Sequence, residues 1–187
     1  DTGKRNLQGL DKPILDSLGI DKNKPEKQQR NQTGSPILEE GDILLNTTLA
    51  ETNDWQQVDL PVVRTLRHFC IETLSSYTED NQACISEVDL LDDKGQPIDK
   101  TKWEVVYVSS EQADKNLGVA ENLFDGDISS FWHTDPATEP GQPHRIIVDI
   151  KEIYKISALR FKVRKGAFLS GKVKEINVYG RPQFFLF

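Results

Sequence analysis

The sequence contains no methionine, only two cysteines and only three histidines among its 187 residues. Two cysteines are too few for a disulfide framework, and the spacing of Cys70 and Cys84 matches no zinc-binding pattern. Both fall in predicted strands that flank one loop, so a cross-strand disulfide and two buried free thiols remain equally open. The missing methionine and the start at Asp1 lead us to expect a processed or trimmed chain.

Long apolar runs and an excess of positive charge are also missing. No stretch approaches the roughly 18 apolar residues that a membrane-spanning helix requires, and no signal peptide opens the sequence. The net charge is −7 and the isoelectric point is near 5.0. Because phosphate backbones and anionic membranes repel such a chain, we expect neither a nucleic-acid partner nor a membrane span.

Catalytic signatures are absent as well. The sequence has no GxSxG, HExxH, P-loop or dinucleotide-binding motif, and its three histidines fit no triad spacing. An enzyme of this size needs a nucleophile with its base, a metal with an open position or two opposed carboxylates. The sequence therefore predicts a protein that binds rather than catalyses.

The hydrophobic pattern divides the chain at residue 37. Residues 1–36 are polar, and residues 21–34 contain no apolar side chain, so we predict an N-terminal extension or linker. Residues 37–187 alternate apolar and polar positions in short segments between turn residues, which predicts one all-β domain. Eight strands, which suit a β-sandwich, are expected over residues 42–49, 55–60, 65–74, 84–91, 103–110, 144–150, 156–163 and 173–179.

One loop carries recognisable chemistry. In residues 120–134 (AENLFDGDISSFWHT), Asp125 and Asp127 flank Gly126, and Ser130 adds a hydroxyl near the end of the loop. Calcium binds six to eight hard oxygens from carboxylates, hydroxyls and carbonyls, and a sharp glycine turn lets such groups face one point. An ordinary Asp-Gly-Asp turn is the alternative. The spacing does not match an EF-hand, because the later carboxylates of that motif are missing.

The surrounding residues resemble the discoidin, or coagulation factor type C, family. The match extends over residues 120–180 through PHRIIVDI, YKISALRFKVRKG and SGKVKEINVYG, and it is closest to carbohydrate-binding modules of glycoside hydrolases. This resemblance implies a galactose-binding-like jelly-roll β-sandwich. Residues 65–98 resemble the final hairpin of such a module and residues 41–60 resemble the strand pair before it. The resemblance therefore implies either a circularly permuted strand order or a chain cut from a tandem array in which the family's last strands come first.

The resemblance also implies a structural calcium ion. Six residues are implicated as ligands, namely the side chains of Asp125, Asp127, Ser130 and Glu87 and the carbonyl groups of Asn122 and Ser86. Glu87 lies on an otherwise apolar strand with Ile85, Val88 and Leu90, where an ionised carboxylate is costly unless it is paired or binds a metal. A Glu87 that simply faces the solvent is the alternative.

Sugar-binding members of the family use a histidine directly after the tryptophan of the loop and an arginine on a following strand. His133 and Arg164 match these positions. Ser170 stands where an asparagine is expected and Gln82 where an aromatic ring is common, so the sugar preference departs from the pattern. Tyr77 or Phe168 could supply the stacking surface instead.

The resemblance implies a non-catalytic carbohydrate-binding module that recognises extracellular, dietary or host glycans. Such a module is expected to be secreted, periplasmic or on the cell surface, and to serve a larger multidomain protein or a glycan-processing enzyme. The alternative is a discoidin-type module that binds proteins or lipids in adhesion or assembly. Large aromatic residues usually fill the core, so Trp55, Trp103, Phe131 and Trp132 are expected in the interior.

Overall fold

A computed structural model describes residues 34–78, 80–137, 141–163 and 170–187 of the chain. Strands dominate these residues, and the only helical segments among them are three 3-10 turns, η1 (Glu40–Asp42), η2 (Asp114–Asn116) and η3 (Ala120–Phe124). The predicted all-β fold is confirmed. No helix in the described ranges is long and apolar enough to cross a membrane.

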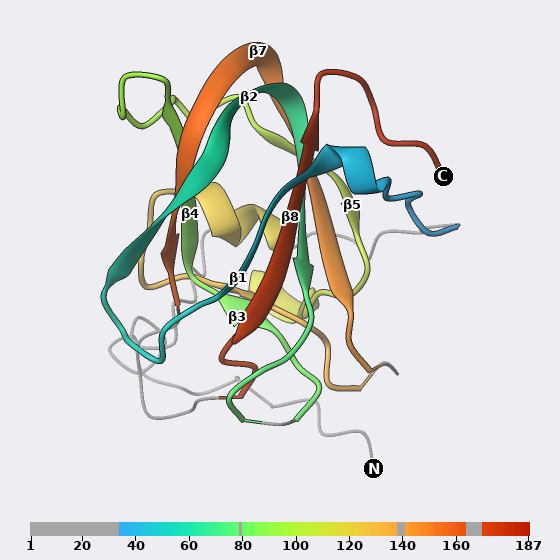
Figure 1. Cartoon of the computed structure of the whole chain (residues 1–187). Coiled ribbons are helices and arrows are strands. Elements are labelled where there is room, and N and C mark those ends of the chain that lie inside the picture. Colours follow the sequence, from blue (N-terminus) through green and yellow to red (C-terminus); the bar gives the residue numbers. More distant parts are fainter. Residues whose placement is uncertain (1–33, 79, 138–140, 164–169) are drawn as a thin grey trace.

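One antiparallel sheet organises the domain (Figure 1). Its strand order is β1-β8-β2-β7-β4, and β5 pairs with β7 beside this path. These strands are β1 (Ile43–Thr48), β2 (Trp55–Thr73), β4 (Glu87–Asp92), β5 (Glu104–Val108), β7 (His144–Lys162) and β8 (Glu175–Arg181). A separate pair consists of β3 (Cys84–Ile85) and β6 (Trp132–His133).

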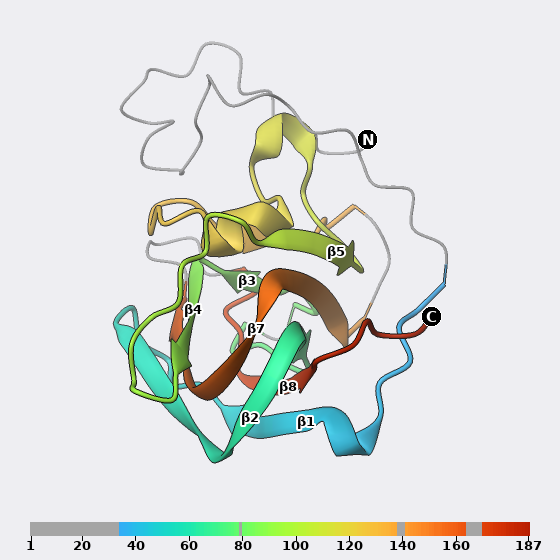
Figure 2. The same cartoon turned by 90° about the horizontal axis from the view of Figure 1, so that it is seen from above.

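The strands β2 and β7 are each 19 residues long and shape the sandwich. They pair along their length, and the register shifts between Asp59 and Arg64 and again between Leu66 and His68. Before these shifts, the first half of β2 pairs with the same part of β7 that also pairs with β4. After them, the second half of β2 pairs with β8 as well as with β7. Figures 1 and 2 show both strands arching over the molecule, so one sheet folds into two layers.

The sequence predicted two strands where each of these long strands occurs. In β2 the exposed residues 61–63 interrupt the alternation, and Pro61 lacks the N–H of a regular ladder position. In β7 the interruption falls at Lys151, whose φ of 73° is unusual for a non-glycine residue. The sequence pattern predicts a loop at each bend, although strand pairing continues on both sides of the bend.

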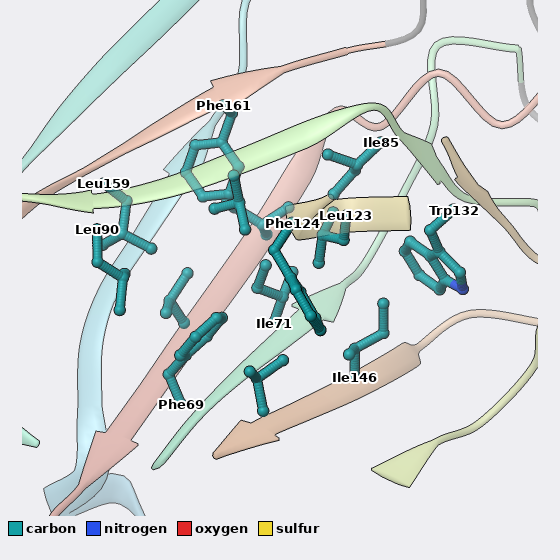
Figure 3. Close-up of a cluster of buried hydrophobic side chains, with 14 of the residues drawn as sticks. Phe69, Ile71, Ile85, Leu90, Leu123, Phe124, Trp132, Ile146, Leu159 and Phe161 are labelled. Atoms are coloured by element: carbon teal, nitrogen blue, oxygen red, sulfur yellow. The ribbon is translucent and has the colours of Figure 1, made fainter. Parts of the chain in front are cut away.

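The core lies between the two layers. Figure 3 shows side chains from several strands and from η3 meeting there, including Phe69, Leu90, Trp132 and Phe161, which are all fully buried. Trp103 and Phe131 are buried too, as predicted. The prediction for Trp55 was wrong.

Trp55 is 39% exposed and lies on the outer side of β2, where the guanidinium of Arg160 stands 5.1 Å from the ring centroid. This cation–π contact accommodates a tryptophan at the surface, since one face of the ring is covered by a cation.

Both cysteines are buried, and they form no disulfide bond with each other. Cys70 lies in a second apolar cluster with Tyr107, Ile147, Tyr179 and Phe185. Burial raises the pKa of the Cys70 thiol far above its ordinary value. The Phe185 ring comes from residues 184–187, an apolar run. Among the described residues this run forms a single bridge, between Ile37 and Leu186.

The core predicts a clear contrast between two aliphatic substitutions. Leu90→Ala removes a fully buried side chain, so we expect a loss of about 2–5 kcal/mol in the free energy of unfolding. Val62→Ala changes a side chain that is 67% exposed and is expected to cost less than about 0.5 kcal/mol. Urea denaturation of both variants measures the difference, and equal losses would contradict this packing.

Candidate functional site

The loop of residues 120–130 folds around its glycine. It begins in η3 and turns at Gly126, whose φ of 79° lies in the left-handed region and whose missing side chain faces open space. The N–H of Gly126 donates a hydrogen bond to Oε1 of Glu87 at 2.8 Å. Residues 39 positions apart in the sequence are therefore in direct contact, because β4 runs past the loop.

The Ser130 hydroxyl is the meeting point of the loop. Its Oγ lies 2.7 Å from Oδ2 of Asp125, 2.9 Å from the Asp127 carbonyl oxygen and 3.5 Å from the Asn122 carbonyl oxygen. Ser130 itself is buried. One carboxylate oxygen, two carbonyl oxygens and one hydroxyl thus converge on a small volume inside the loop.

Glu87 brings a second carboxylate to this place. The residue is 1% exposed, so the solvent-facing alternative is wrong. The pKa of Glu87 is raised to about 7, chiefly by burial and also by hydrogen bonding with the Asp125 carboxyl, whereas Lys100 and the Gly126 N–H lower it. Glu87 is buried whereas Asp125 lies at the exposed side of the loop, and two carboxyl groups that approach each other favour a shared proton or a bound cation.

Lys100 supplies a positive charge on the far side of Glu87. Its Nζ lies 2.5 Å from Oε2 of Glu87 and 2.7 Å from Oδ1 of Asp89. Burial alone lowers the pKa of this ammonium, but the net pKa is raised because the Asp89 and Glu87 carboxylates hold the charged form. Lys100 therefore stays protonated beside the candidate ligands.

Two predicted ligands take other roles in part. Oδ1 of Asp127 accepts hydrogen bonds from the N–H and the hydroxyl of Ser129, so this carboxylate caps its own turn while its carbonyl faces Ser130. Ser86 lies between β3 and β4, is buried, and donates its N–H to the Lys162 carbonyl. These two residues border the site through the backbone.

The donor set suits a hard cation. Carboxylate, carbonyl and hydroxyl oxygens are the ligands that calcium prefers, whereas zinc and its neighbours favour nitrogen and sulfur. Across the described ranges, no three His, Cys, Asp or Glu side chains are grouped for a metal. Any ion held by Glu87 and Asp125 would therefore depend on the main-chain and hydroxyl oxygens around them.

The predicted sugar-binding residues are only partly described. Arg164 and Phe168 lie outside the described residues. His133 is 5% exposed on β6, and its Nδ1 donates a hydrogen bond to the Thr134 carbonyl at 2.5 Å. A side chain added at Gly118 would strike His133, so the backbone packs closely against this histidine.

Tyr77 and Ser170 lie on two neighbouring loops. The Tyr77 hydroxyl donates to the Leu49 carbonyl at 2.7 Å, and Nζ of Lys174 stands 5.5 Å from the ring centroid. Ser170 is exposed, and its hydroxyl donates to Oδ2 of Asp80 at 2.8 Å. Neither contact involves His133, so these residues mark the rim of the candidate ligand site rather than its centre.

Sequence reasoning missed the residues that hold these loops together. The Asp80 carboxylate accepts hydrogen bonds from Ser170, from the Gly171 N–H and from Ser76, and these bonds lower its pKa although burial alone would raise it. An aspartate in a polar turn carries no sequence signal for such a role. Its partners become visible only when the loops meet.

A second missed group is a chain of amide and hydroxyl contacts beside His133. The Thr134 hydroxyl donates to Oε1 of Gln82 at 2.6 Å, the Gln142 amide donates to the Gln82 carbonyl, and the Thr73 hydroxyl donates to Oε1 of Gln142. Gln82 and Gln142 are half-buried. Gln82 stands where the family resemblance predicted a ring, so a polar group occupies that position.

Comparison with known proteins identifies the domain. Residues 105–183 match the family described as "F5/8 type C domain". This segment, which is less than half of the chain, is similar to F5/8 type C (discoidin) domains. The segment contains the whole 120–130 loop and the strands β6, β7 and β8, and it lacks Glu87, which lies on β4 before it.

A bacterial relative adds a second similarity. The chain is 33% identical over 84 residues to a sialidase of Micromonospora viridifaciens, which is 44% of this chain and 13% of the sialidase. The chain thus matches only a small part of that relative. The similarity agrees with the predicted family, and the strands β2 and β4, which precede the matched segment, both pair with β7 inside it.

His144 allows a test of the loop packing by pH. The residue is fully buried, its Nε2 donates to the Asn81 carbonyl at 2.7 Å, and its Nδ1 has no hydrogen-bond partner. Burial lowers its pKa from 6.5, and the Asn81 bond only partly opposes this. The stabilising contribution is therefore present above pH 6.5 and is lost as the pH falls through the lowered pKa.

We expect His144→Gln, which keeps a donor for Asn81, to lose less stability than the wild type between pH 7.5 and about pH 5. Melting temperatures of both proteins across this range measure the effect. The titration of Glu87 changes the stability in the direction opposite to that of His144. This effect is the same in both proteins, so it cancels when their stabilities are compared. Parallel pH profiles would contradict a buried neutral His144.

Proposed function

We propose that this discoidin domain is a non-catalytic carbohydrate-binding module with a structural calcium site. The observation that carries the proposal is the convergence of Glu87 and the 120–130 loop beside His133 in a chain that resembles part of a sialidase. The similarity to a glycoside hydrolase supports a role within a larger multidomain protein. A secreted, periplasmic or cell-surface location follows from such a role.

The calcium ion would be held by one oxygen each from Glu87, Asp125 and Ser130 and by the carbonyl groups of Asn122 and Asp127. Its chemistry is electrostatic, since a divalent ion balances the negative charge of the buried Glu87 and of the exposed Asp125. Ser130 links Asp125 to both carbonyls through its hydroxyl. The residues therefore preorganise a loop that precedes His133 by only two positions.

The glycan would bind where residues 75–78 and 80–83, residues 133–137 and 141–142, and residues 170–173 approach one another. The described part of this region offers hydroxyl, amide and carboxylate groups of Thr134, Gln82, Gln142 and Asp80, which suit directional hydrogen bonds to sugar hydroxyls. His133 lies at its inner side. The matching arginine, Arg164, lies outside the described residues.

The calcium proposal predicts a stability difference. Saturating Ca²⁺ at a hundredfold excess over its dissociation constant is expected to stabilise the wild type by about 2.7 kcal/mol relative to a chelator. Asp125→Asn removes one of the two facing carboxylates and is expected to abolish this shift. Thermal melts with Ca²⁺ and with EDTA measure it.

Asp93→Asn is the matched control, because Asp93 is an exposed aspartate on the turn after β4. It should retain the full Ca²⁺ shift. A wild-type protein whose melting temperature is the same in Ca²⁺ and EDTA would remove the cation from the proposal.

The glycan proposal predicts binding on a glycan array in the presence of Ca²⁺. His133→Ala and Arg164→Ala should each weaken the bound signal by tenfold or more, in line with the loss of about one charge-assisted hydrogen bond. Lys155→Ala, an exposed cation on β7, should leave the signal unchanged. Melting temperatures show whether each variant is folded.

The same experiment distinguishes the alternative function. Vesicles of phosphatidylcholine and phosphatidylserine are tested beside the array with the same variants. Binding to vesicles with silence on every glycan would favour a lipid-binding discoidin module and refute the carbohydrate proposal.

A further inference from the structure

Lys100 reaches the candidate cation site from outside the loop. It belongs to the turn between β4 and β5, and its side chain is 17% exposed. Its ammonium donates to Oε2 of Glu87 at 2.5 Å, to Oδ1 of Asp89 at 2.7 Å and to the Val88 carbonyl at 3.2 Å. All three ammonium protons therefore have acceptors on β4.

The two oxygens of Glu87 face different groups. Oε2 is held by Lys100, whereas Oε1 accepts the hydrogen bond from the Gly126 N–H at 2.8 Å. The oxygen on the side of the loop is thus Oε1. A cation among the loop oxygens can take this one oxygen while the ion pair with Lys100 stays intact.

Lys100 is itself fixed by a further network. Oδ2 of Asp89 accepts a hydrogen bond from Nη2 of Arg160 at 2.6 Å, and Arg160 lies over the exposed Trp55 ring. Asp89 is thus shared between two cations and is 7% exposed. Because this carboxylate cannot turn away without leaving a cation unpaired, the Lys100 ammonium is held in place.

We propose that Lys100 is a built-in counter-charge that restricts Glu87 to one ligand oxygen and weakens divalent-cation binding at the loop. The inference rests on the proposed calcium site. An ammonium and a divalent cation that share one buried carboxylate repel each other across it, and this repulsion is large in a region of low dielectric constant. In the absence of the cation, the same ammonium neutralises Glu87, so the domain does not depend on calcium for folding.

The test compares Lys100→Met with the wild type and with Lys102→Met, an exposed lysine two residues along the same turn. Methionine keeps the length of the apolar stem and removes the charge. Isothermal titration with Ca²⁺ is expected to show binding about tenfold tighter for Lys100→Met, and unchanged binding for Lys102→Met. The melting temperature of Lys100→Met should fall in EDTA and recover in Ca²⁺, so its calcium-induced shift exceeds that of the wild type.

Lys100→Arg keeps the positive charge and should retain the weaker wild-type affinity, which separates charge from side-chain shape. If Lys100→Met is too unstable in EDTA, it is refolded in Ca²⁺ and the dissociation constant is measured by competition with a chelator. If the wild type binds Ca²⁺ and Lys100→Met binds it equally or more weakly, the counter-charge role of Lys100 is overturned while the cation site stands. No binding by the wild type would overturn the cation site and this inference with it.

Discussion

The contact between Glu87 and the 120–130 loop is the constraint on which the functional end of the domain depends. A buried glutamate accepts the N–H of Gly126 and meets the carboxyl group of Asp125, which lies at the exposed side of the loop. Such an arrangement is costly unless positive charge or a proton balances it. The chain provides Lys100 on one side and loop oxygens suited to a cation on the other.

This contact exists because the sheet bends. The long strand β7 pairs with β2, β4 and β5, and it carries both layers of the sandwich. The second half of β7 pairs with β4 and so places Glu87 next to the 120–130 loop, which precedes β7 in the chain. The bulges in β2 and β7 therefore shape the sandwich, because a straight pair of strands could not contribute to two layers.

The candidate site combines the 120–130 loop with polar loops around it. His133 follows the loop directly and is fixed by Thr134 and by the close approach of Gly118. Asp80 ties the turn before β3 to the residues that precede β8. A rigid inner part with polar loops around it is a common design for binding sites, because loops carry specificity while the scaffold positions them.

Local pattern was sufficient to predict the all-β class, the Asp-Gly-Asp loop and a buried Glu87, because alternation, turn residues and a charge among apolar neighbours are properties of short segments. The long bent strands, the surface position of Trp55 and the roles of Asp80 and Lys100 depended on tertiary structure. Trp55 has the same aromatic side chain as the buried tryptophans, and only the position of Arg160 across the sheet distinguishes it. Contacts between residues far apart in the chain arise from strand pairing, which no local pattern encodes.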